Sequence, residues 1–132
     1  MGSIEDAISS KENTIEVTKE IIGARKVGES GTVNIKIKFP KDAPKKCYYD
    51  LTDVVPSGMR FIEINNNNEN WYLNNRENQK LYFSVYNKNG EATVSYNVRG
   101  TIPGCYLAES AIIMHHSANI NGYSERGEVK ID

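Results

Sequence analysis

The sequence predicts an all-β fold, an antiparallel β-sandwich of immunoglobulin-like architecture with seven or eight strands. Short segments in which apolar and polar residues alternate recur along the chain, and turn signals separate them at intervals of about ten residues. No stretch shows a convincing helical period. A closed β-barrel is the alternative architecture for the same pattern.

The clearest strand covers residues 33–39, where apolar residues alternate with Asn and Lys until Pro40 ends the strand. Ile15 and Val17 alternate with polar residues and predict a first strand. Residues 27–31 form a glycine-containing turn. Asn-Lys-Asn-Gly at 87–90 is a hairpin signal. The other segments with strand character are 47–54, 61–64, 81–85, 92–98, 111–115 and 127–131.

The apolar residues on the inward phase of these strands are expected to form the core. They are Val33, Ile35, Ile37, Phe39, Leu51, Phe83, Val85, Val94, Tyr96 and Val98.

Length and charge limit the classes of function. A chain of 132 residues suits one domain, and a net charge of −1 gives no support for a nucleic-acid or anionic-membrane partner. No apolar run approaches the roughly 18 residues that span a bilayer. Met1-Gly2-Ser3 is typical of residues added for expression, so we interpret 1–13 as added residues and linker, and 14–132 as the domain of a larger protein.

The asparagine-rich segment 65–78 holds eight asparagines and only Trp71, Tyr72 and Leu73 as a short strand. Asparagine favours turns over ladders. We therefore expect a mobile surface excursion with one aromatic anchor, Trp71.

Histidines and carboxylates do not form a catalytic pattern. His115 and His116 are neighbours on a strand, so they should point to opposite faces and should not bind one metal ion. Asp50 and Asp53, three residues apart, should also face opposite ways. We expect Asp50 to face solvent and Asp53 to bond backbone amides of the following turn. No catalytic residue, cofactor site or metal site is predicted.

Two covalent links are considered. Cys47 and Cys105 could form a disulfide in an extracellular protein, or stay as two buried thiols. A spontaneous Lys–Asn isopeptide bond has candidates by residue type in Lys36 or Lys38 with Asn97. These lysines lie on the outward phase and should point to water.

Aromatic residues could form an interaction surface. Tyr48, Tyr82 and Tyr86 lie on the outward phase of their strands, and Trp71 is nearby. An outward aromatic row indicates contact with a neighbouring domain or protein. Cross-strand pairing that only supports the sheet is an equally good interpretation.

The order of several segments resembles the carboxy-terminal macroglobulin-like module of bacterial alpha-2-macroglobulin-family proteins. Residues 15–20, 27–29 and 33–37 resemble the family's opening strand, its Val-Gly-acid turn and the next strand. Residues 108–124 are similar to its ending, although His115 stands where an aromatic residue is expected. The remaining motif positions are Asp53, Pro56 and Gly58, and then Tyr96, Arg99, Pro103, Gly104 and Tyr106.

Family members are large extracellular protease traps, many of which capture the protease through a Cys–Gln thioester. No Cys-x-x-Glu-Gln occurs in this chain. The resemblance therefore implies a non-catalytic C-terminal module of a secreted or surface-anchored inhibitor. It would pack on the thioester domain or other domains of its own parent chain and affect the trapped protease indirectly.

A second hypothesis is a stalk or adhesion module of a bacterial cell-surface protein. An enzyme is the third, because no group of residues meets the geometric minimum for catalysis. The location implied by the first two hypotheses is extracellular or at the cell surface.

Overall fold

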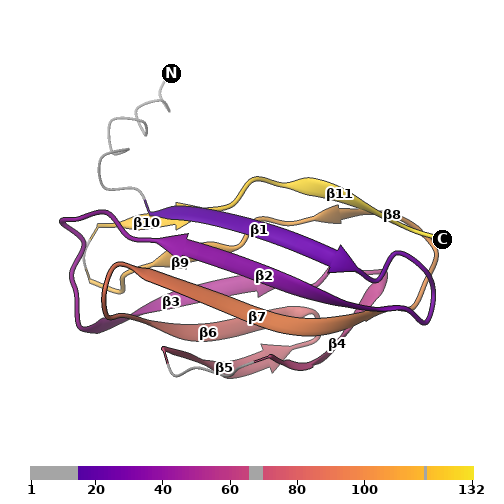
Figure 1. The fold of residues 1–132 in the computed structure, drawn as a ribbon, viewed down its shortest axis with the longest axis horizontal. Coiled ribbons are helices and arrows are strands. Elements are labelled where there is room, and N and C mark those ends of the chain that lie inside the picture. Colours follow the sequence, from indigo (N-terminus) through magenta and orange to yellow (C-terminus); the bar gives the residue numbers. More distant parts are fainter. Residues whose placement is uncertain (1–14, 66–69, 118) are drawn as a thin grey trace, which may run out of the picture.

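The computed structural model describes residues 15–65, 70–117 and 119–132, which form an all-β sandwich (Figure 1). Within these ranges every strand pair is antiparallel. The strands are β1 (Glu16–Gly23), β2 (Ser30–Lys38), β3 (Cys47–Val54), β4 (Met59–Ile64), β5 (Trp71–Glu77), β6 (Lys80–Asn87), β7 (Glu91–Gly100), β8 (Gly104–Ala108), β9 (Ile112–Met114), β10 (Asn121–Tyr123) and β11 (Gly127–Ile131).

Two sheets form the layers of the sandwich. One has the strand order β1-β2-β7-β4, and the other has the order β10-β9-β3-β6-β5. Strands β8 and β11 form a separate two-stranded ladder, which lies at the end of the molecule that carries the C-terminus (Figure 1). The predicted fold class is confirmed, and the sheets are open rather than closed into a barrel.

The described residues contain eleven strands, more than the seven or eight predicted. The surplus comes from short or mostly exposed strands. β10 has three residues, which is too few to show alternation, and Trp71 is the only buried residue of β5. β8 has only one buried residue, Ala108.

The core lies between the two sheets, and all ten residues predicted for it are buried. Large side chains that the prediction did not include are also buried, among them Tyr49, Trp71, Leu81 and Ile113. Tyr49 packs on Phe39, with ring centroids 4.7 Å apart.

The expectation of a mobile excursion at 65–78 is wrong for the part that the structure describes. Residues 71–77 form β5, the edge strand beside β6, with a register shift between Leu73 and Asn75. Trp71 is buried and packs edge-on against Phe83, with ring centroids 5.7 Å apart. Residues 66–69 lie outside the described ranges.

Candidate functional site

A cluster of three polar side chains lies in the core between the sheets. Asp53 of β3 is fully buried, and the side chain of Lys19 of β1 is 3% exposed. Lys19 Nζ donates to Asp53 Oδ1 at 2.7 Å, and the Tyr96 hydroxyl of β7 donates to Asp53 Oδ2 at 2.5 Å. The carboxylate of one sheet thus binds two strands of the other.

Backbone carbonyls complete the surroundings of the ammonium group. Lys19 Nζ also donates to the carbonyl oxygens of Glu109 at 3.0 Å and Val54 at 3.3 Å. Three acceptors match the three donors of an ammonium group. Lys19 lies on the inward phase of β1 and opposite the buried Ile35 of β2. No prediction from the sequence included it.

The expected role of Asp53 in the turn is therefore wrong, because its carboxylate points into the core. The turn that follows β3 is held instead by Gln79. Its amide nitrogen donates to the carbonyls of Val55, Pro56 and Met59 at 3.2, 3.0 and 2.9 Å. Asp50 is exposed, as expected from its phase.

Tyr96 is held protonated in the cluster. Burial, followed by the negative charge of Asp53 and the hydrogen bond to it, raises the pKa of the Tyr96 hydroxyl well above its ordinary value of 10.0. A neutral hydroxyl is the form that can donate to the carboxylate.

This raised pKa predicts that the folded state loses stability in alkaline solution. Below pH 10.0 both states keep the Tyr96 proton. Above it the unfolded chain releases the proton while the folded state keeps it, so the free energy of unfolding falls as the pH rises toward the folded pKa. Urea unfolding between about pH 9 and pH 11 measures this slope. Tyr96→Phe should make the slope shallower, and an unchanged slope would contradict the assignment.

Several motif positions pack together at the turn between β3 and β4. The Tyr106 ring lies against Gly58, where an added Cβ atom would come within 2.2 Å of the ring. The Tyr106 hydroxyl donates to the carbonyls of Ile102 and Pro103, both at 3.0 Å. Thr101 N donates to the Gly58 carbonyl at 2.8 Å. These contacts give the spacing of the two motifs a structural reason.

The other motif positions have separate places. Pro56 accepts a hydrogen bond from Met59 N at 2.9 Å, which closes the turn. Gly104 has a φ of +146°, a conformation that favours glycine. Arg99 is exposed on β7, opposite Arg60 of β4. The structure brings Asp53 together with Tyr96 and Gly58 with Tyr106, and it leaves Arg99 on the surface.

We expect Gly58→Ala to lower the free energy of unfolding by about 1–3 kcal/mol, a typical cost of overpacking. The new methyl group would overlap the Tyr106 ring, which two hydrogen bonds hold in place. Gly127→Ala is the matched control, because an added Cβ there meets nothing within 4 Å. Urea midpoints compare the variants, and equal midpoints would contradict the contact.

An exposed apolar surface covers the outer side of the β10-β9-β3-β6-β5 sheet. Leu51 and Ile113 point into the core, so the neighbouring Met114 and Ile112 point outward beside Asp50 and Thr52. We call this surface the tyrosine face, and its members are Tyr48, Tyr72, Tyr86, Ile112, Met114 and Tyr123.

The aromatic side chains of the tyrosine face contact one another. The Tyr48 ring centroid lies 5.0 Å from that of Tyr86 and 5.7 Å from that of Tyr72. Tyr48 is still 46% exposed and Tyr72 48%. Cross-strand pairing and an available surface therefore coexist, and the two interpretations of the tyrosines are compatible.

Two predicted members of an aromatic surface differ from the expectation. Trp71 is a core residue and offers no surface, because it lies on the inward phase of β5. Tyr82 is partly buried, and its hydroxyl donates to Glu77 Oε1 at 3.1 Å. Tyr72 and Tyr123, which the sequence did not single out, are more exposed.

The structure does not bring the two cysteines together, and both are free thiols. Cys47 is partly buried at the start of β3, while Cys105 is exposed on β8. The start of β3 and the β8–β11 ladder lie toward opposite ends of the molecule (Figure 1). Neither a disulfide nor two buried thiols describes this arrangement.

The two histidines follow β9, which ends at Met114. Their rings stack, with centroids 4.8 Å apart, so the expected opposite orientation is wrong. His115 Nε2 lies 3.6 Å from Cys47 Sγ, and Ser117 N donates to its Nδ1 at 3.1 Å. Among the described residues no group of three or more His, Cys, Asp or Glu side chains could hold a metal ion.

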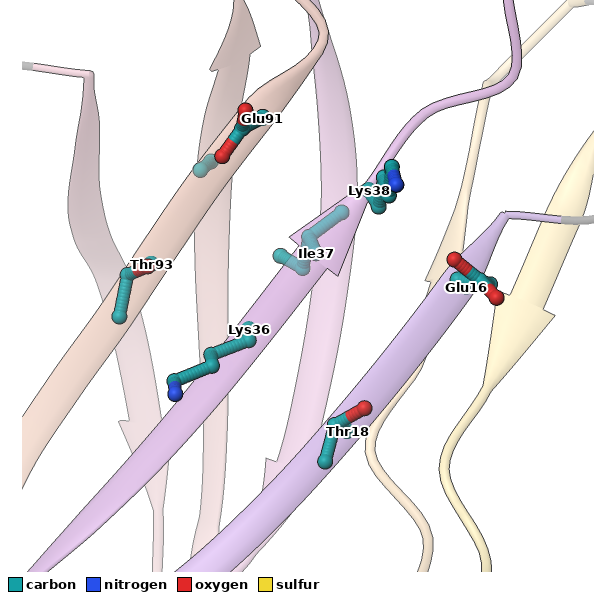
Figure 2. A pocket seen from close by; sticks show the side chains of 8 residues that line it. Glu16, Thr18, Lys36, Ile37, Lys38, Glu91 and Thr93 are labelled. Atoms are coloured by element: carbon teal, nitrogen blue, oxygen red, sulfur yellow. The ribbon is translucent and has the colours of Figure 1, made fainter.

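A shallow hollow lies on the outer side of β1, β2 and β7 (Figure 2). Lys38 stands between Glu16 and Glu91 of the flanking strands, an alternation of charge that supports a solvated sheet surface. Lys36 and Lys38 are both exposed here, as their phase predicted. No helix in the described ranges is long and apolar enough to cross a membrane.

Solved structures similar to this chain include an alpha-2-macroglobulin, a pilin and a cohesin module. Escherichia coli alpha-2-macroglobulin activated by porcine elastase matches with a TM-score of 0.68 and 14% identity, over 89% of this chain and 13% of that one. The structure of domains D2 and D3 of the major pilin SpaD from Corynebacterium diphtheriae matches with a TM-score of 0.64 and 8% identity. The match covers 87% of this chain and 52% of the pilin chain. A cohesin module of a Clostridium perfringens family 33 glycoside hydrolase matches with a TM-score of 0.62 and 16% identity. The match covers 89% of this chain and 96% of the cohesin module.

These likenesses define the class of fold. The chain is an immunoglobulin-like β-sandwich module, and its fold is that of a macroglobulin-like domain, as the resemblance implied. It spans only a small part of the alpha-2-macroglobulin chains that it matches. No protein-family model and no curated protein matches the sequence.

Proposed function

We propose that this chain is a non-catalytic module of a secreted or surface-anchored alpha-2-macroglobulin-like protease inhibitor. It acts by packing on a neighbouring domain of its own parent chain. The fold supports this proposal, and so does the order of the sequence motifs.

The tyrosine face is the observation that carries the proposal. It presents apolar side chains from strands β5, β3, β9 and β10 on one side of the molecule. The most exposed of these side chains is Tyr123, at 69%. A hollow of about 500 Å³ lies at its β9–β10 edge, lined in part by Ile112, Met114 and Tyr123. Aromatic residues and methionine are enriched in protein interfaces.

We introduce Tyr48→Ala into the full-length parent protein. It should weaken the docking of this module on its neighbouring domain by at least about 1 kcal/mol, the cost of truncating an energetically important interface residue. The fraction of a test protease that the parent retains should fall. Thr93→Ala is the matched control, because Thr93 is exposed on the outer side of the other sheet.

Deleting this module from the full-length parent should also lower the fraction of protease that the parent retains. Unchanged retention after this deletion would overturn the inhibitor role. If the retained fraction of protease falls when the module is deleted but not in Tyr48→Ala, the tyrosine face is not part of the interface.

A stalk or adhesion module of a bacterial surface protein is the second candidate. The described chain begins with β1 in one half of the long axis and ends at the opposite tip (Figure 1). Such an arrangement suits modules joined end to end. Binding of the chain to glycans or matrix proteins would favour this role over the inhibitor role.

A further inference from the structure

Lys19 and Asp53 place an amine and a carboxyl group in direct contact in a buried site. Nζ and Oδ1 are 2.7 Å apart, with 3% and 0% of the two side chains exposed. We propose that these side chains condense into an isopeptide bond, which links β1 covalently to β3 across the sandwich. This modification is separate from the proposed function and does not depend on it.

The reaction uses a neutral amine and a neutral carboxylic acid. An uncharged amide product does not carry the desolvation cost of a buried ion pair. Transfer of one proton from Nζ to Oδ1, along the 2.7 Å hydrogen bond, gives a neutral amine beside a neutral carboxylic acid. The amine then carries the lone pair that a nucleophile needs.

The bond changes balance without an oxidant, a reductant or a co-reactant. Nζ attacks Cγ of Asp53, and the Cγ–Oδ2 double bond becomes a single bond to an oxyanion. The oxyanion collapses back to a carbonyl while the Cγ–Oδ1 bond breaks. Oδ1 already holds one proton and takes a second from Nζ, so it leaves as water. The product is an amide whose nitrogen keeps one hydrogen.

Tyr96 stabilises the charge that forms during this step. Its hydroxyl donates to Oδ2, the oxygen that carries the negative charge in the intermediate. A preorganised donor at that position in a buried site acts as an oxyanion hole. In the product, Oδ2 is the amide oxygen and keeps the same hydrogen bond.

Backbone carbonyls hold the amine in place before the reaction. The oxygens of Glu109 and Val54 accept from Lys19 Nζ, so the lysine cannot turn away from Asp53. Holding two reacting groups in contact raises their effective concentration greatly. After condensation the amide N–H retains a carbonyl acceptor, and no buried charge is left.

The lysines that the sequence suggested do not have this geometry. Lys36 and Lys38 are exposed on the outer side of β2 (Figure 2). The side-chain oxygen of Asn97 accepts from the Thr32 hydroxyl at 3.2 Å. The inward phase of Lys19 on β1 therefore decides which lysine reacts.

The mass of the intact, denatured chain tests the proposal. After incubation at neutral pH, we expect a mass lower than the sequence mass by one water molecule. Digestion should give a branched peptide that joins the segments of Lys19 and Asp53. A chain that keeps its full sequence mass would overturn the proposal.

Lys19→Arg is the control variant, because it keeps the positive charge but supplies no reactive amine. It should keep its full mass. A water loss that persists in Lys19→Arg would be a succinimide or another dehydration, and it would also overturn the proposal. Tyr96→Phe should form the bond at least about tenfold more slowly, since it lacks the oxyanion donor; formation at the rate of the unchanged chain would exclude the role of Tyr96.

Discussion

Asp53→Ala is expected to lower the free energy of unfolding by about 3–5 kcal/mol, the cost of removing one partner from a buried ion pair. The Lys19 ammonium would stay in the core with carbonyl groups alone, and the Tyr96 hydroxyl would lose its acceptor. Urea unfolding followed by circular dichroism measures the loss. The loss would be larger where the pair has condensed, because a covalent link also restricts the unfolded chain.

A triple variant separates the cost of an orphaned charge from the worth of the cluster. Lys19→Met, Asp53→Leu and Tyr96→Phe together replace every polar group of the cluster by an apolar one. Such replacements are often neutral or stabilising, so the triple variant should be more stable than Asp53→Ala. If it is equally unstable, the loss comes from packing and the charge argument is wrong.

The sequence contained part of this cluster. Tyr96 was predicted to lie in the core, and Asp53 shares the phase of the buried Leu51. Lys19 continues the inward phase of Val17, so a lysine at that position was itself a signal. Their meeting could not be read from spacing, because Lys19 and Asp53 are 34 residues apart and lie on different sheets. Only the packing of one layer on the other brings them together.

Segment 65–78 shows a different limit of sequence-based prediction. Its asparagines favour a loop, yet β5 is an edge strand with one face in water and tolerates them there. Asn74 Nδ2 even donates to the Ser84 hydroxyl of β6 at 2.6 Å. Only Trp71 and the partly buried Leu73 mark the inward phase of β5 before its register shift, so the alternation is too short to identify a strand from the sequence. The asparagine content of β5 therefore led to the wrong prediction of a loop.

Trp71→Ala should therefore cost about 3–5 kcal/mol of the free energy of unfolding, the usual range for truncating a buried tryptophan. Trp71 is 2% exposed and its ring packs against Phe83. The Phe83 ring in turn stacks on Tyr96, with centroids 6.2 Å apart. Its removal would leave a cavity between β5 and the core. A surface anchor on a loop would cost far less.

Tyr72→Ala is the matched control for Trp71→Ala. Tyr72 is the next residue of the same strand, but it is 48% exposed on the tyrosine face, so its loss should cost less than about 1 kcal/mol. Both variants should be followed by circular dichroism, because Trp71 is the single tryptophan of the chain and its fluorescence disappears on substitution. Equal costs for the two variants would mean that Trp71 does not anchor β5, whereas a large difference assigns the stability of this edge strand to one side chain.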